Sequence, residues 1–483
     1  MSHFTKIFYF MLLGSALSVY SVRNHNPSGT TRSSATTDAK IDISNGHLAT
    51  LTSQIATLIT HSSNISTNTS TTAINTAGNS GSVASIVVLK NLSGSDHNGG
   101  SANWDYPLTI TSATTGNLFK LSENIVVGSY SVGNFPTVSG FGGNAAIIIN
   151  KNNVTIDLGG QTLSTTVTGN AIHGIYIMPG IKGTQIISST QNVNNKGIIQ
   201  DFKGFGIYIA GASGNTVQNT SIDNISCAYN AKGLYAEYAH DISITNSNFI
   251  ANTSPSVLVH GIYMANIKNA LISNVKANAN NTSAAANAYG IYFENATNSI
   301  IEHSSADLNF STGTGGSAYG IYITSTGSAT SSSNSIVSST ANENYCAATN
   351  TANQEAVGIM LTTNASTTTS NTISSCTTQR NVFTGSTATN PNGYGIKING
   401  INNNMIKGCT SSYNKTNGIL DTAVNTSTNT YHSNTCTKNG TDGLTNYSVS
   451  FTTGPLNVLR VNFRDYMGIH NALSAYANIE TVD

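Results

Sequence analysis

The most regular feature of the chain is a five-residue block with glycine in second place. Ile or Leu follows the glycine, the fourth residue is usually tyrosine, and the fifth is usually apolar. In Tyr289-Gly-Ile-Tyr-Phe293, large apolar residues alternate with other positions, which is the period of a β-strand with one buried face. Successive glycines are separated by 23 to 38 residues. The blocks lie at 173–177, 205–209, 232–236, 260–264, 289–293, 319–323, 357–361, 394–398, 417–421 and, degenerate, 442–446. Such self-similarity predicts a solenoid of about ten coils.

Two further elements lie within the repeats. One is a short run that begins with Asn, such as Asn334-Ser-Ile-Val-Ser338, with copies at 269–273, 298–302, 371–375 and 404–408. The other is an Asn that closes the following turn: Asn230, Asn252, Asn309, Asn344, Asn381, Asn414 and Asn439. Two or three short strands joined by Asn and Gly turns make one coil of a β-helix. Strict hexapeptides and the L-x-x-L-x-L pattern are absent, so the sequence predicts an all-β, right-handed parallel β-helix rather than a left-handed one or a leucine-rich repeat.

A distinctive segment precedes the first glycine block. Residues 153–163 read Asn-Val-Thr-Ile-Asp-Leu-Gly-Gly-Gln-Thr-Leu. With the coils that follow, this segment resembles the pectate-lyase-like superfamily, specifically its NosD-like and carbohydrate-binding or sugar-hydrolase β-helix repeats, in which an N-x-x-I-D-L-x-G-x-x-I rung commonly opens the helix. The resemblance covers roughly residues 85–447. It implies the fold alone, because this fold hosts lyases, hydrolases, epimerases, adhesins and phage fibres.

The termini differ from the repeats. Residues 1–21 resemble a secretory signal peptide, with Lys6 before an apolar run of about 11 residues that is shorter than the ~20 of a membrane span. We therefore expect a secreted or cell-surface protein without a membrane span after cleavage; an uncleaved anchor is the alternative. Residues 22–40 form a linker. Heptad-like spacing in 41–78 predicts a helix that caps the solenoid or forms an oligomeric stalk, with disorder as a third alternative. The β-helix is expected over 83–447, and 448–483 as a C-terminal cap, or alternatively an attachment segment.

The composition of the chain limits the classes of partner that we expect it to bind. Charged residues make up 8% of the chain, against about 25% in typical proteins, and the formal net charge is zero. A neutral chain has no electrostatic footprint for nucleic acid or anionic lipid, so we expect neither partner. The five cysteines are too few and too irregularly spaced for a disulfide framework, and the absence of a CxxC pair argues against zinc. We expect no cofactor and no metal.

The tyrosines of the blocks are the main candidate for function. Strict alternation would place both apolar positions inside and Gly and Tyr outside. Coils stacked ~4.8 Å apart would then align six exposed rings over about 24 Å, beside a shallow groove above the glycines. The six are Tyr176, Tyr208, Tyr235, Tyr263, Tyr292 and Tyr322. Such a ladder suits sugar rings or a protein partner; alternatively, the tyrosines only stabilise the sheet and the glycines only serve the bend. Insertions that precede the blocks, at 281–288, 311–318, 346–356 and 384–392, could wall a binding face.

The strongest acid pair is Glu237 and Glu294. Each lies four residues after its glycine and two coils from the other, at a predicted 9–10 Å, near the upper end of the range for inverting glycosidases. The alternative is that both are ordinary surface acids. His173 and His260 share a block position, and strict alternation points them inward, three coils apart and too distant for one metal.

Two other residue pairs are weaker candidates for a functional site. His240 and Asp241 are neighbours, but no nucleophile accompanies them. Cys376 and Cys409 occupy equivalent positions in adjacent coils, which predicts a buried ladder, or alternatively a disulfide.

These patterns favour a secreted or surface β-helix without enzymatic activity, acting as an adhesin, fibre or coat component that contacts glycans or proteins along the tyrosines. The alternative is a polysaccharide lyase, glycoside hydrolase or epimerase. Among the arginines only Arg380 lies within the coils, and the Asn-Thr-Asp, Asp-Asp and Gly-His-Gly motifs of hydrolases with this fold are absent.

Overall fold

The computed structural model divides into two units, Met1–Val83 and Ala84–Asp483. It describes residues 86–89, 108–114, 116–127, 144–167, 172–190, 195–347, 354–364, 368–384, 392–422, 429–440, 447–449, 459–461 and 479–481. The first unit, with the predicted signal peptide, linker and heptad segment, lies outside the described residues. Within them, no helix is long and apolar enough to cross a bilayer.

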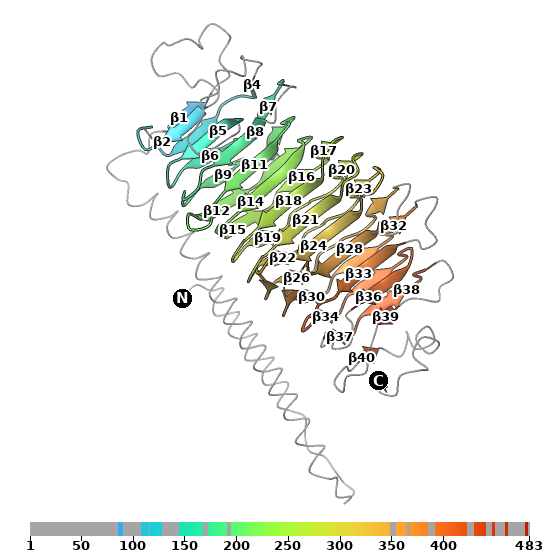
Figure 1. Ribbon diagram of the computed structural model, residues 1–483. Helices are drawn as coiled ribbons and strands as arrows, with labels where there is room; N and C mark the ends of the chain where they lie inside the picture. The colour runs from blue at the N-terminus through green and yellow to red at the C-terminus, as the bar shows by residue number, and fades with distance from the viewer. Residues whose placement is uncertain are drawn as a thin grey trace, which may run out of the picture. The chain divides into compact units, whose positions relative to one another are not determined.

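The described chain is all-β, and each strand pairs in parallel with the equivalent strand of the next coil (Figure 1). The largest sheet runs through β1 (Ile86–Leu89), β3 (Leu118–Leu121), β6 (Thr155–Asp157), β9 (Gln185–Ile187), β12 (Val217–Asp223), β15 (Ala239–Thr245), β19 (Leu271–Ser273), β22 (Ile300–Glu302), β26 (Ser335–Val337), β30 (Thr372–Ser374), β34 (Met405–Lys407), β37 (Thr430–His432), β40 (Leu459–Val461) and β41 (Ile479–Thr481).

The second large sheet contains the glycine blocks. It runs through β2 (Leu108–Thr111), β5 (Asn144–Asn150), β8 (Ile172–Ile177), β11 (Phe205–Ala210), β14 (Lys232–Glu237), β18 (Val259–Ala265), β21 (Ala288–Glu294), β24 (Ala318–Thr324), β28 (Ala356–Thr362), β33 (Gly393–Asn399), β36 (Asn417–Asp421) and β39 (Tyr447–Val449).

Shorter strands complete the coils. One wall holds β4 (Ile125–Val127), β7 (Thr162–Thr165), β10 (Gly197–Gln200), β13 (Ile225–Ala228) and β16 (Asn248–Ile250), and further along β31 (Thr377–Gln379), β35 (Thr410–Ser412) and β38 (Thr435–Thr437). Another row holds β17 (Thr253–Ser254), β20 (Asn281–Thr282), β23 (Phe310–Ser311), β27 (Tyr345–Cys346) and β32 (Val382–Phe383), and β25 (Ser331–Ser332) pairs with β29 (Thr368–Thr369). This topology confirms the predicted right-handed parallel β-helix.

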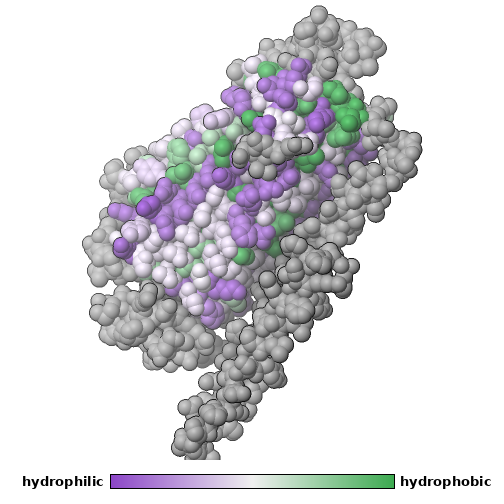
Figure 2. Space-filling view, turned by 180° about the vertical axis from the view of Figure 1, so that it is seen from behind, coloured by the Kyte–Doolittle hydropathy of each residue, from purple (hydrophilic) through white to green (hydrophobic). Residues whose placement is uncertain are grey.

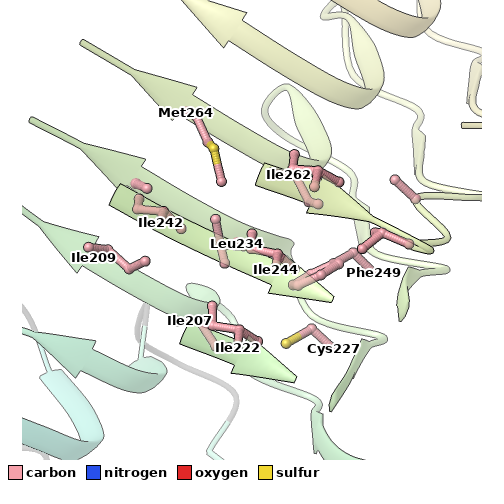
Figure 3. Close-up of a cluster of buried hydrophobic side chains, with 14 of the residues drawn as sticks. Ile207, Ile209, Ile222, Cys227, Leu234, Ile242, Ile244, Phe249, Ile262 and Met264 are labelled. Carbon is pink, nitrogen blue, oxygen red and sulfur yellow. The ribbon is translucent and has the colours of Figure 1, made fainter. Parts of the chain in front are cut away.

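Columns of apolar side chains fill the interior. In the second sheet, Ile207, Leu234 and Ile262 lie directly above one another and are fully buried. The largest sheet adds Ile222 and Ile244, and the short wall adds Cys227 and Phe249 (Figure 3). Burial of one such side chain stabilises the fold by about 2 kcal/mol. On the outside, hydrophobic residues lie in small groups among polar and weakly polar ones (Figure 2).

The glycines do not line a groove, so that prediction is wrong. A Cβ on Gly290 would lie 2.7 Å from the Asn309 amide nitrogen and 2.7 Å from the carbonyl oxygen of Gly320. The position therefore faces the interior and the next coil, where only glycine fits. The strand bends there, and the residue before glycine and the tyrosine after it both face outward. The bend also corrects the placement of His173 and His260, whose rings pack on the outer aromatic side chains and not in the core.

Buried asparagines connect the coils at one corner. The backbone N–H of Asn280 donates to Oδ1 of Asn309, whose own N–H donates to Asn344 in the next coil, each at 3.1 Å. The Asn280 and Asn309 side-chain amides donate along the same column. The full ladder is Asn230, Asn252, Asn280, Asn309, Asn344, Asn381, Asn414 and Asn439. Sequence analysis identified these residues except Asn280.

The ladder supports a strained turn. The residue before each ladder asparagine has positive φ, a conformation that costs a non-glycine residue on the order of 1 kcal/mol. These residues are Tyr229, Ala251, Ala279, Leu308, Glu343, Arg380, Tyr413 and Lys438. Their variety shows that the hydrogen bonds of the following asparagine, and not the residue's own propensity, define the turn.

The second sequence block is out of register by one residue between early and late coils. Ile301 pairs with Ile336, which places Ser299, and not Asn298, beside Asn334. From Asn334 onward a second buried ladder runs through Asn371 and Asn404. The alignment of the early asparagines with the late ones was therefore wrong.

The five cysteines are buried free thiols. Cys376 and Cys409 lie in adjacent coils, immediately before the paired residues Thr377 and Thr410. The predicted cysteine ladder is confirmed, and the alternative of a disulfide is not what the structure contains.

We expect Asn309→Ala to destabilise the β-helix by about 3 kcal/mol, because the N–H and the side-chain amide of Asn280 lose their buried acceptor. The urea midpoint, followed by circular dichroism, measures this. Asn248→Ala is the matched control, since that side chain is only half-buried on the outside of β16. Equal midpoints for the two variants would contradict a structural role for the ladder.

Candidate functional site

The candidate site is the outward surface of β8, β11, β14, β18, β21 and β24, which we name the tyrosine face. Its six tyrosines lie in register, one on each strand: Tyr176, Tyr208, Tyr235, Tyr263, Tyr292 and Tyr322. Met360 and Lys397 continue the column on β28 and β33. Tyr176 is only 3% exposed, so the ladder presents five half-buried rings and not the six exposed rings that alternation predicts.

A second outward column lies beside the first. It consists of the residues that precede the glycines: His173, Phe205, Lys232, His260, Tyr289, Tyr319, Val357 and Tyr394. Tyr289 and Tyr319 are 6% and 7% exposed, so the second column is mostly buried. Within it, His173 stacks on Phe205 at 5.1 Å between ring centres, and Lys232 lies 5.0 Å above the Phe205 ring.

The rings of the two columns cover one another. Tyr263 stacks on Tyr292 at 4.4 Å and 8°, and Tyr289 lies 4.7 Å from Tyr292. Because neighbouring rings occupy the flat ring faces at these positions, the surface there offers ring edges and hydroxyl groups. A ligand at these positions would be held mainly by hydrogen bonds and edge contacts, and less by the flat stacking that an isolated aromatic ring provides.

Two carboxylates complete the tyrosine face. Each belongs to the residue two positions after a ladder tyrosine, and strand alternation places it on the same side. Glu237 accepts hydrogen bonds from the hydroxyls of Tyr208 and Tyr235, both at 2.8 Å. Ala265 lies between Glu237 and Glu294 in register, which confirms that the two acids are two coils apart.

Glu294 repeats the arrangement with one addition. Its Oε2 accepts from Tyr263 at 2.5 Å and Tyr292 at 3.1 Å, while Oε1 accepts from the Thr326 hydroxyl at 2.6 Å. Both acids are therefore surface residues organised by phenols. Neither has a salt-bridge partner within the part of the chain that the structure describes.

The phenols are fixed as hydrogen-bond donors. Burial, reinforced by hydrogen bonds to Glu237, raises the pKa of Tyr208 and of Tyr235 well above the usual value. Burial and the Glu294 hydrogen bond do the same for the pKa of Tyr263. Ionised phenolates would have to lie beside carboxylates, so these side chains stay protonated at physiological pH.

Glu355 is a third acid on this side of the solenoid, and sequence analysis missed it. Its carboxylate accepts from the Tyr319 hydroxyl at 3.2 Å and forms an ion pair with Lys397, which also lies 4.9 Å from the Tyr394 ring centre. The Glu355 and Lys397 side chains are only 9% and 16% exposed.

The position of Glu355 carried a signal that sequence analysis did not use. Equivalent coils have Asn287 and Asn392 there, and each is hydrogen-bonded to the phenol two residues later, Tyr289 and Tyr394. Glu355 is the acidic member of this polar row, and it lies within the insertion 346–356, one position before its end. An acidic residue at a position that other coils fill with a small polar residue, near the end of an insertion, is the signal that would have identified Glu355.

The remaining candidate pair lies away from the tyrosine face. His240 and Asp241 belong to β15 in the largest sheet, away from the tyrosine face, and Asp241 accepts from the Asn269 amide at 3.0 Å. Across the described residues, no group of three His, Cys, Asp or Glu side chains is arranged to hold a metal ion.

Similarity to known proteins is confined to the fold. The solved structures that resemble this chain are right-handed parallel β-helix proteins. The periplasmic alginate epimerase AlgG is 11% identical over 69% of this chain and 76% of its own, with a TM-score of 0.39. The Dettilon tailspike protein is 14% identical over 71% and 60%, with a TM-score of 0.36. The A-module of Azotobacter vinelandii mannuronan C-5 epimerase AlgE4 is 11% identical over 72% and 87%, with a TM-score of 0.30.

No protein family and no curated protein matches the chain in sequence. The strand pairing itself defines the class: the described chain has the right-handed parallel β-helix fold that the sequence predicts. Its tyrosine face is a property of this chain's own residues.

We expect the β-helix to lose stability as the pH falls from about 6.5 towards 4. Burial, with a smaller contribution from Lys232, lowers the pKa of His173 to about 4, and burial lowers that of His260 as well. Unfolded histidines take up protons below their ordinary pKa of 6.5 while the folded ones stay neutral, so acid favours unfolding, by on the order of 3 kcal/mol for His173.

Urea midpoints of wild type and His173→Asn, measured across this pH range, test the effect. The variant should lose less stability than wild type as the pH falls, because Asn does not titrate in this range. Its side-chain oxygen can still accept the Phe205 N–H that His173 Nδ1 accepts at 2.9 Å, so the fold should be retained. His303→Asn, at an exposed position, is the control and should follow wild type. Parallel curves for all three proteins would refute the assignment.

We expect Lys397→Met to destabilise the fold by about 3 kcal/mol, since it leaves Glu355 buried without its cation. The double variant Glu355→Gln/Lys397→Met should recover most of that loss. A double-mutant cycle of chemical unfolding measures the coupling. Additive effects of the two substitutions would show that the pair does not act as a unit.

Proposed function

We propose that this chain is a secreted or surface β-helix protein that binds glycans along the tyrosine face, as an adhesin, fibre or coat component. The observation that carries the proposal is the pair of carboxylates, Glu237 and Glu294, each held by two phenols on an otherwise aromatic strip. A glycan site needs fixed polar groups that accept hydrogen bonds from sugar hydroxyls, and a surrounding aromatic surface that makes apolar contact with the sugar rings. The zero net charge fits such a ligand better than nucleic acid.

Pre-organisation supports binding at this face. The carboxylates are held in place by the phenols before any ligand arrives, so little side-chain entropy is lost on binding. The stacked rings are likewise fixed by their neighbours, at centre-to-centre distances of 4.4 to 5.1 Å along the ladder from Tyr176 to Tyr322.

Catalysis is the second candidate function, favoured by one observation. Glu237 and Glu294 lie two coils apart, with one coil between them. The corresponding distance of roughly 9–10 Å lies near the range of carboxyl separations in inverting glycosidases. Against it, the two carboxylates have closely similar phenol partners. An acid and a base require environments that differ. Binding is therefore the better-supported function.

We expect Tyr235→Phe and Tyr292→Phe each to weaken binding of the best ligand on a glycan array by about tenfold. Each variant keeps the ring and loses a hydroxyl that fixes a carboxylate. Tyr345→Ala, on the β27 wall, should bind as wild type does. Unchanged affinity in both Phe variants would remove the tyrosine face from the proposal.

Acidic and neutral oligosaccharides should be incubated with the protein and assayed for new reducing ends and for unsaturated products. We expect neither to form. Turnover that disappears in Glu237→Gln would replace the binding proposal with the enzymatic one.

A further inference from the structure

We infer that the ligand of the tyrosine face is a neutral, hydroxyl-rich glycan that lies extended along the solenoid axis, and not a polyuronate. This inference rests on the proposed function and adds the class of ligand. It follows from the charge, the hydrogen-bonding capacity and the spacing of the side chains on that face.

The centre of the face carries uncompensated negative charge. Glu237 and Glu294 have no salt bridge among the described residues, and Lys397 is already paired with Glu355. Lys232 lies at the opposite end of β14 from Glu237, five residues or about 16 Å along the strand. A chain of uronates laid over this strip would bring its own carboxylates next to two fixed ones, and like charges repel.

The face also offers acceptors and few donors. The hydroxyl hydrogens of Tyr208, Tyr235, Tyr263 and Tyr292 are committed to Glu237 and Glu294. A carboxylate has about four acceptor sites, and the hydrogen bonds to phenols occupy only two of those on Glu237. The ligand must therefore supply the donors, and sugar hydroxyls do so without adding charge.

The spacing fits an extended glycan. Glu237 and Glu294 are separated by one intervening coil, whose residue at that position is the small, uncharged Ala265. A pyranose ring advances an extended glycan by about the spacing of one coil, ~4.8 Å. Two sugars would then each meet a carboxylate, and the one sugar between them would lie over the Ala265 coil.

Isothermal titration calorimetry with four hexasaccharides tests the inference: β-1,4-linked glucose and mannose as neutral probes, and galacturonate and mannuronate as acidic ones. At least one neutral probe should bind tenfold or more tighter than either acidic probe, with an affinity that changes little with salt because no charge is neutralised. Glu237→Gln/Glu294→Gln should weaken neutral binding about tenfold and bring the acidic probes within threefold of the neutral ones.

Glu302→Gln/Glu343→Gln removes the same charge from other walls and should keep the wild-type preference. Acidic probes that bind as tightly as neutral ones, no binding of either neutral probe, or an unchanged preference in the Glu237 and Glu294 double variant would each overturn the inference. If acidic glycans were preferred and binding still depended on Tyr235 and Tyr292, this inference would fail while the proposed function stood. Binding insensitive to both tyrosines would defeat the proposed function itself.

Discussion

In-register parallel stacking of the coils is the constraint on which the rest of the structure depends. Because each strand pairs only with its counterparts one coil away, every sequence position becomes a column along the axis. Inside, many of the columns consist of aliphatic residues or Asn, and the Asn ladder adds side-chain hydrogen bonds to the backbone pairing. A residue that fits its column is reinforced from both sides, so one unsuitable side chain disturbs three coils.

The same stacking organises the outer surface. Phenols that repeat on neighbouring strands come close enough for one glutamate to accept from two coils at once, as Glu237 does from Tyr208 and Tyr235. The arrangement holds charge on a half-buried aromatic strip where the described residues provide no counter-ion. Glu355 differs, because it is more deeply buried and is neutralised by Lys397. One wall thus contains a structural ion pair beside two carboxylates whose remaining acceptor sites suit a ligand.

Local exceptions to strict alternation decided where several side chains lie. At the glycine blocks the strand bends, because the glycine position meets the backbone carbonyl of the next coil and, as at Gly261 and Gly290, an asparagine amide. The residues on either side of the bend consequently share the outer face, which brings His260 against Tyr263. Insertions of different length before the blocks leave this register intact, since Tyr289 still pairs with Tyr319 across one of them.

The sequence by itself determined the fold, the alignment of the six tyrosines and the two-coil separation of Glu237 from Glu294, because these follow from a period of two along a strand and one repeat per coil. Only the tertiary structure decided the bend at glycine, the burial of Tyr176, the one-residue shift before Asn334 and the pairing of Glu355 with Lys397. Those features depend on contacts between residues about 30 to 40 positions apart, whose distances and packing no repeat period specifies.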